Sequence, residues 1–157
     1  MVKMVLTVCV GSIFLISCLK KNDGCQYGSD SAVAPASEQS QIKSYLDSAG
    51  ITANLSPYGF YYQVISPGNG ASPGQCSQVT VSYKGWLTKG TVFDQSSSSV
   101  FILGGLIDGW RESLPLIRQG GEIRVYIPPS LGYGVASNPV ITPNSILIFD
   151  IFLLDVQ

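Results

Sequence analysis

The stretch Phe101-Ile-Leu-Gly-Gly-Leu-Ile-Asp-Gly-Trp110 decides the fold that we expect for this chain of 157 residues. It is apolar and rich in glycine, and its tryptophan leads directly into Arg111-Glu-Ser-Leu-Pro-Leu-Ile117. Tryptophan buries a large apolar area, and glycine lets the backbone turn tightly and approach other groups closely. The pattern therefore predicts a buried Trp110 at the start of a short helix that runs from Arg111 to about Arg118.

Strand patterns lie on both sides of this segment. We expect strands over residues 60–65, 79–84, 122–127 and 146–156. The two middle segments alternate apolar and polar residues, as strands with one buried face do, and the last is almost wholly apolar. A sheet with a single short helix packed across it belongs to the α+β class.

The N-terminal part contains one helical pattern, over Ser37 to Ala49. Ser37 is the expected N-cap, and Gly50 is suited to close the helix. The apolar positions follow helical spacing and form one stripe, which consists of Ile42, Tyr45, Leu46 and Ala49. We expect this stripe to pack on the domain rather than to form a dimer.

The first 17 residues have the character of a secretory signal. Lys3 is followed by an apolar run from Met4 to Ile16 that is too short for a comfortable membrane span. The run ends in Leu15-Ile-Ser-Cys18, which resembles the bacterial lipobox. This resemblance implies cleavage before Cys18 and acylation of that cysteine, which would anchor the protein durably to a membrane. A plain signal peptide with an incidental cysteine is the alternative.

Residues 18–35 are polar, small and aperiodic, as in a flexible tether that holds a domain off a membrane. Cys25 lies in this tether. In an oxidising envelope compartment, Cys25 and Cys76 would be the two cysteines left after processing and lipidation, so we predict a disulfide between them. Two unrelated thiols are the alternative.

The composition excludes several classes of function. Nine basic and ten acidic side chains are nearly balanced and form no large basic patch, so we expect no nucleic-acid partner. The chain has no histidine, and its four cysteines form no C-x-x-C pair. We therefore expect no metal site and no cofactor, and any catalysis must proceed without a Ser-His or Cys-His nucleophile.

Four further motifs accompany the opening stretch. They are Val81-Ser-Tyr-Lys-Gly85, Val92-Phe-Asp-Gln95, Leu131-Gly-Tyr-Gly134 and Leu147-Ile-Phe-Asp150. Together the five segments resemble the FKBP family of peptidyl-prolyl isomerases, and the resemblance implies a twisted antiparallel β-sheet wrapped around one short α-helix. The chain then divides into a lipoprotein signal peptide (1–17), a lipidated tether (18–35), an N-terminal helix with linker (36–57) and an FKBP-type domain (58–157).

The resemblance also implies an aromatic pocket that accepts a proline ring. Trp110 would form its floor, and Tyr83, Phe93 and Phe149 would form its walls. Leu106 would line it as well. Tyr83 and Phe149 also alternate correctly for core residues, so their positions suit either role.

Three further residues are implied to act on the peptide. The Ile107 amide and the Tyr133 hydroxyl would donate hydrogen bonds to the carbonyls that flank the proline, and Asp94 would face the carbonyl region and orient the site. Capping of a turn is the alternative role for Asp94. The sequence departs from the family at Ser99, a wall position that is often aromatic, and this departure concerns substrate preference and inhibitor affinity.

The function implied is cis-trans isomerisation of X-Pro bonds in exported or unfolded polypeptides (the EC 5.2.1.8 type), with FK506-type macrolides as expected ligands. The location implied is a bacterial cell envelope, with a lipid anchor in the outer membrane. Two alternatives remain: a binding module or holdase chaperone for proline-containing segments with little turnover, and a purely structural lipoprotein. The same apolar cavity serves turnover and binding, so pocket residues do not separate them.

Overall fold

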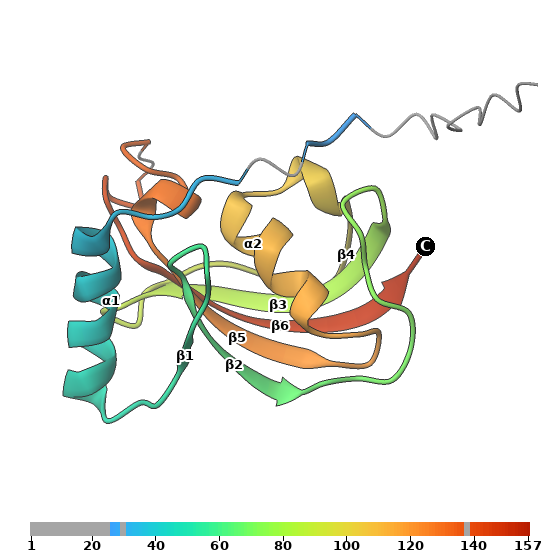
Figure 1. Ribbon diagram of the computed structural model, residues 1–157, viewed down its shortest axis with the longest axis horizontal. Helices are drawn as coiled ribbons and strands as arrows, with labels where there is room; N and C mark the ends of the chain where they lie inside the picture. Colours follow the sequence, from blue (N-terminus) through green and yellow to red (C-terminus); the bar gives the residue numbers. More distant parts are fainter. Residues whose placement is uncertain (1–25, 29–30, 137–138) are drawn as a thin grey trace, which may run out of the picture.

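The computed structural model describes residues 26–28, 31–136 and 139–157 (Figure 1). The helices are α1 (Ala36–Ala49) and α2 (Asp108–Ser113), and three 3-10 turns are η1 (Leu103–Gly105), η2 (Leu114–Leu116) and η3 (Pro129–Leu131). The strands are β1 (Asn54–Leu55), β2 (Tyr61–Ser66), β3 (Gln78–Leu87), β4 (Val92–Ile102), β5 (Glu122–Ile127) and β6 (Leu147–Val156).

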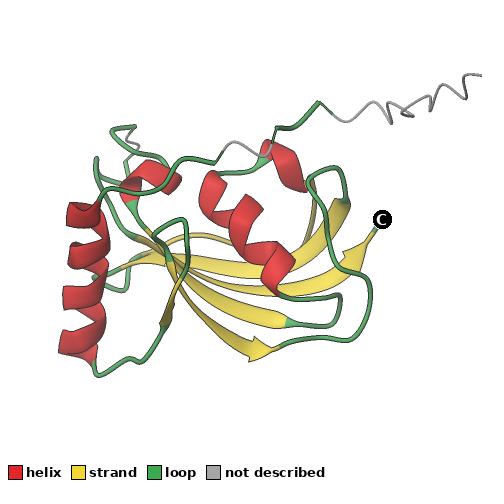
Figure 2. Ribbon diagram, viewed as in Figure 1, coloured by secondary structure: helices red, strands yellow, loops and turns green. Residues whose placement is uncertain are grey.

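The strands form one antiparallel sheet in the order β1-β2-β5-β6-β3-β4. The sheet is twisted and lies behind α2, while α1 stands at one end of the molecule (Figure 2). The predicted α+β fold, a twisted antiparallel sheet around one short helix with a further helix before it, is confirmed.

The core lies between α2 and the inner face of the sheet. Trp110 and Leu114 meet the alternate side chains of the central strands, and both are buried. The buried strand residues of this inner face are Val79, Val81, Ile123, Val125, Ile127, Leu147, Phe149, Ile151 and Leu153. The period-two pattern of the sequence thus marks the face that packs on the helix.

The central helix begins earlier and ends earlier than the sequence predicts. Its first turn contains Trp110, and the amides of Trp110 and Arg111 both donate to the Ile107 carbonyl, at 2.9 Å and 3.1 Å. After Ser113 the chain continues as η2, because Pro115 has no amide hydrogen with which to extend the α-helical pattern. The helix predicted over Arg111 to Arg118 is therefore wrong in its bounds, although Trp110 does lie at the start of a helix and is buried.

The sequence missed two strands, β1 and β4. The eleven residues of β4 include a run of serines, which are weak strand formers, and its register on β3 shifts between Val81 and Tyr83. Two residues, Ser97 and Ser98, are accommodated in that irregularity, since Val81 pairs with Ser99 and Tyr83 with Ser96. The four predicted strands are present within a few residues of their expected bounds.

Helix α1 packs on the outer face of the sheet, as predicted. Ile42 and Leu46 are buried against Tyr61, Tyr126 and Ile148. Arg124 supports this side of the sheet, because it pairs with Asp150 and its guanidinium lies 5.4 Å from the centre of the Trp86 ring.

Two details of the predicted helix are wrong. The N-cap residue is Pro35, two positions before the expected Ser37, and no side chain caps the helix. Ala49 is exposed, so the buried stripe ends before the last turn. Gly50 closes the helix in a left-handed conformation with φ 67°, as predicted.

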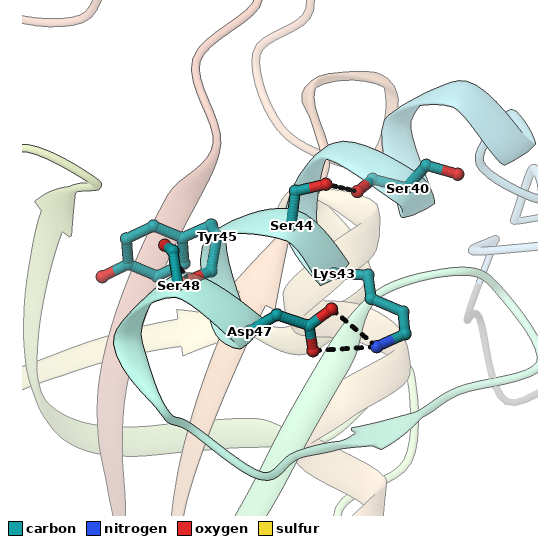
Figure 3. Close-up of polar contacts among 6 residues, drawn as sticks. All are labelled: Ser40, Lys43, Ser44, Tyr45, Asp47 and Ser48. Atoms are coloured by element: carbon teal, nitrogen blue, oxygen red, sulfur yellow. Dashed lines mark hydrogen bonds and ion pairs between the residues drawn. The ribbon is translucent and has the colours of Figure 1, made fainter.

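The opposite face of α1 is polar and satisfies its own hydrogen bonds (Figure 3). Lys43 Nζ lies 2.8 Å and 2.9 Å from the two carboxylate oxygens of Asp47, one turn away. Ser40, Ser44 and Ser48 donate to backbone carbonyls of the same helix. The polar side chains of this face therefore form these hydrogen bonds within α1 itself.

The predicted tether (18–35) is described in part, and the described residues contact the domain. The Tyr27 ring lies over Gly104, where a side chain would clash with it, and Ser31 lies between Arg111 and Glu112 of α2. Ala34 is buried, and its amide donates to the Tyr58 carbonyl at 2.9 Å. These contacts differ from the free tether expected for these residues.

Two predictions concern residues outside the described ranges. The signal peptide with Cys18 lies there, and so does Cys25, whereas Cys76 is disulfide-bonded in the structure. Among the described residues, neither helix has the length and apolar character that a membrane crossing would need.

We predict that Ile42→Ala lowers the free energy of unfolding by about 3 kcal/mol, because the substitution leaves a cavity between α1 and the sheet. Ser44→Ala, on the exposed face of the same helix, should change it by less than about 0.5 kcal/mol. Urea denaturation followed by circular dichroism measures both. Equal stability of the two variants would contradict the packing of α1.

Candidate active site

A pocket opens where α2 begins, between this helix and strands β3, β4 and β6. Its volume is about 180 Å³. Sites for drug-sized ligands occupy roughly 300–1,000 Å³, so this pocket suits one small ring or side chain. It is lined by Tyr83, Asp94, Phe101, Leu106, Ile107, Trp110, Tyr133 and Phe149.

Trp110 forms the floor, and the other rings stand on it edge to face. The Trp110 ring centre lies 5.2 Å from both the Tyr83 and the Phe149 ring centres, with interplanar angles of 84° and 89°. Phe101 meets it at 6.2 Å and 86°. Such T-shaped pairs are favoured because the positive edge of one ring faces the negative face of another. The rings therefore brace one another and give the pocket a fixed apolar shape.

Gly85 on β3 makes room for two of these rings. A Cβ atom there would lie 2.6 Å from the Phe149 ring and 2.7 Å from the Phe93 ring. The bare backbone lets Phe93 and Phe149 meet, at 5.3 Å between centres and 89° between planes. Glycine is thus required at this position for steric reasons.

The structure brings together seven of the eight residues that the sequence assigned to the pocket. The exception is Phe93, which supports Phe149 from behind and does not line the cavity. Ser99, expected at a wall position, also does not line it, and its hydroxyl donates to the Ser96 hydroxyl at 2.8 Å.

The sequence missed Phe101 as a pocket residue. Phe101 pairs with Val79 on β3. It lies two residues after Ser99, so the side chains of Ser99 and Phe101 belong to the same face of β4. That parity is the signal which could have found it. Phe101, the next residue on the same face of β4, therefore supplies the aromatic wall that Ser99 does not.

The polar side of the pocket contains one carboxylate and two phenols. The Tyr83 hydroxyl donates to Asp94 Oδ2 at 2.8 Å. Burial, this hydrogen bond and the negative charge of Asp94 together raise the pKa of Tyr83 to about 12. Burial and the charge of Asp94 also raise the pKa of Tyr133 above its ordinary value. Both phenols are therefore protonated at neutral pH.

Two donors at the edge of the pocket have no partner among the described residues, and neither has the buried indole Nε1 of Trp110 at its floor. Among the described residues, neither the Tyr133 hydroxyl nor the Ile107 amide donates a hydrogen bond to another protein group. Ile107 is the N-cap residue of α2, where backbone amides have no acceptor within the helix. A bound peptide carbonyl could accept from either of them.

The outer side of α2 is held in place by charged groups. Arg111 lies 3.4 Å from Asp108, and it also donates to the Ser31 hydroxyl at 2.9 Å. Ser31 in turn donates to Glu112 at 2.6 Å, and a hydrogen bond to Glu112 raises the pKa of Tyr58. These contacts fix the helix whose inner side carries Trp110.

Comparisons with known proteins agree with this architecture. The family model described as FKBP-type peptidyl-prolyl cis-trans isomerase matches residues 70–154, more than half of the chain. The isomerase FkpA of Escherichia coli (strain K12) is 47% identical over 103 residues, which cover 63% of this chain and 38% of FkpA. The outer membrane protein MIP of Legionella longbeachae is 41% identical over 106 residues, which cover 64% of this chain and 46% of that protein.

A solved structure extends the match to the N-terminal part. The peptidyl-prolyl cis-trans isomerase of Pseudomonas syringae pv. tomato superposes with a TM-score of 0.68 at 28% identity, over 83% of this chain and 99% of that one. The chain spans less than half the length of the two curated relatives described above.

We predict that Asp94→Asn lowers the pKa of Tyr83 from about 12 part of the way towards 10.0, because the charge is lost and the burial remains. A folded-state pKa above the unfolded value contributes stability that is complete below pH 10.0 and is lost as the pH rises towards 12. The loss of stability over this range should therefore be smaller in the variant.

Carbon-13 NMR of labelled tyrosine rings follows the titration of each phenol, and urea denaturation at several pH values follows the stability. Asp47→Asn, on the exposed face of α1, is the control and should leave Tyr83 unchanged. An identical Tyr83 titration in Asp94→Asn and in the unsubstituted protein would contradict the assigned cause.

Proposed function

Because the chain belongs to the FKBP-type peptidyl-prolyl cis-trans isomerase family, we propose that it catalyses the cis-trans isomerisation of X-Pro bonds in polypeptides. The observation that carries this proposal is the small aromatic pocket on Trp110, with two free donors at its edge. A pocket of this size takes a proline ring and leaves the flanking peptide outside.

The reaction needs no bond to be broken. Rotation about an X-Pro bond is opposed by amide resonance, with a barrier of roughly 18–20 kcal/mol. In the twisted amide this resonance is lost, the nitrogen becomes pyramidal and the carbonyl is less polarised. A dry apolar pocket favours this less polar state over the planar ground state, which lowers the barrier.

Each pocket residue has a part in this mechanism. Trp110 and Phe149 grip the ring, together with Tyr83, Phe101 and Leu106 at the walls. The Ile107 amide and the Tyr133 hydroxyl donate to the flanking carbonyls, so the chain on either side of the proline is held while the amide turns. Asp94 faces the carbonyl region, and its orientation is fixed by the hydrogen bond from Tyr83.

The proposed substrates are proline-containing segments of unfolded or exported polypeptides, and FK506-type macrolides are proposed to compete for the same pocket. The proposed location is a bacterial cell envelope, with the protein anchored through acylated Cys18 after removal of residues 1–17. The name of the Legionella longbeachae relative, an outer membrane protein, supports this location. We propose a division into a connecting segment (18–35), of which Tyr27, Ser31 and Ala34 contact the domain, a helix with linker (36–57) and an isomerase domain (58–157).

We predict that the chain from Asp23 onward accelerates isomerisation of short X-Pro peptides in a protease-coupled assay, and that an FK506-type macrolide abolishes the acceleration. Trp110→Ala should lose most of the activity, because it removes the pocket floor. Tyr133→Phe should lose part of it, because it removes one donor and keeps the ring.

Phe152→Ala is the matched control, since Phe152 lies on the same strand as Phe149 and on the opposite face of the sheet. It should retain full activity. Circular dichroism establishes that each variant is folded. Peptide binding without turnover would favour a binding module, and full activity in a folded Trp110→Ala variant would refute the proposed mechanism.

We predict that the full-length protein, produced in a bacterium that processes lipoproteins, partitions into detergent in a Triton X-114 phase separation. Cys18→Ser should move it to the aqueous phase, because no acyl chain can then be attached. Cys9→Ser is the control and should leave the partition unchanged. Mass spectrometry of the N-terminal peptide identifies the acyl chains, and an unmodified Cys18 would contradict the anchor.

A further inference from the structure

The turn that leads into Tyr133 cannot cap its own N-terminus. This turn, η3, has Pro128 as its N-cap residue and Pro129 as its first residue. Proline offers no side-chain acceptor, and Pro129 has no amide hydrogen. The Ser130 amide is thus the first donor of the turn that needs an acceptor from elsewhere.

The acceptor comes from the first turn of α1. Glu38 Oε2 accepts a hydrogen bond from the Ser130 amide at 3.0 Å and another from the Ser130 hydroxyl at 2.7 Å. A carboxylate at the N-terminus of a helical turn makes strong, charge-assisted hydrogen bonds. Figure 1 shows the upper end of α1 beside the orange turn that contains Ser130.

Glu38 is itself held firmly. The neighbouring Gln39 donates to the Ala34 carbonyl at 2.8 Å, and Ile42, one turn further along α1, is fully buried. The packing of α1 on the sheet therefore fixes the backbone from which the Glu38 carboxylate reaches Ser130.

The peptide group that joins Pro129 to Ser130 connects the capped amide to the residues on both sides of Tyr133. The Pro129 carbonyl accepts from the Gly132 amide at 3.0 Å and from the Gly134 amide at 2.8 Å, so it holds both neighbours of Tyr133. Leu131 is buried and fixes the turn from below. The direction of the Tyr133 side chain into the pocket thus depends on the conformation of η3.

We propose that Glu38 is a positioning residue for the isomerase site: by capping η3 at Ser130, it holds Tyr133 in the pocket. The inference rests on the proposed function of Tyr133 as a hydrogen-bond donor to the substrate. Glu38 lies outside residues 70–154, the part that matches the family model, so this support is added to the domain by the N-terminal helix.

The test compares Glu38→Ala with Glu38→Gln and Lys43→Ala in the chain from residue 18 onward. Loss of a helix cap weakens the capped conformation about fivefold, so Glu38→Ala should lower kcat/KM for an X-Pro peptide by about that factor. Glu38→Gln keeps an acceptor oxygen and should lose less than about twofold. Lys43→Ala removes the pair with Asp47 on the same helix and should leave kcat/KM unchanged (Figure 3).

A double-mutant cycle with Tyr133→Phe separates positioning from general loss of structure. Once the hydroxyl is absent, Glu38→Ala should cost less than about twofold, because the two groups act through one interaction with the substrate. Equal losses in both backgrounds, in variants whose melting temperatures match, would overturn the inference.

Hydrogen exchange gives a readout that does not depend on turnover. In Glu38→Ala, the Gly132 and Gly134 amide protons should exchange about fivefold faster, while those of β5 should be unchanged. Absence of isomerase activity in the unsubstituted protein would refute the proposed function. Unchanged exchange at Gly132 and Gly134 would refute the capping by Glu38, whatever the activity.

Discussion

The burial of Trp110 against the inner face of the sheet is the interaction on which the rest of the structure depends. Helix α2 has only six residues, and a helix of that length is not stable alone. It is held by Trp110 and Leu114 inside the core and by Arg111 on its outer side. The same indole ring closes the core and forms the pocket floor, so the binding surface is as rigid as the core beneath it.

Two glycines make room for this ring and for the neighbouring Phe149. A Cβ at Gly109, the residue before Trp110, would lie 2.6 Å from Ile127 on β5, so a larger residue would push α2 away from the sheet. A Cβ at Gly85 would likewise displace Phe149, which forms a wall of the pocket. The pocket therefore results from close approach of backbones as much as from the aromatic residues themselves. This requirement explains why glycine-containing motifs carry the family resemblance.

The sequence was informative where local pattern and structure coincide. Of the six strands among the described residues, alternation located two and apolar runs bounded by turns located two more, and the ordered motifs identified all but one of the residues that line the pocket. Phe101 escaped because β4, the serine-rich strand that carries it, was not predicted, so the two-residue spacing from Ser99 was not applied. The bond from Ser130 to Glu38 escaped for a different reason, since 92 residues separate its partners. Contacts between distant segments become visible only once the chain is folded.

The placement of α1 has an energetic consequence for the active site. The loop after η3 has little apolar burial of its own, since Tyr133 and Val135 are 45% and 79% exposed. Segments with so few buried contacts open at low free-energy cost, which would release the Tyr133 hydroxyl from the pocket. Helix α1 buries Ile42 and Leu46 on the far side of the sheet. The hydrogen bonds from Ser130 to Glu38 attach the turn before Tyr133 to this well-packed helix. Apolar burial remote from the pocket thereby restrains the Tyr133 side chain, for which we propose a role in catalysis and which the loop alone could not hold.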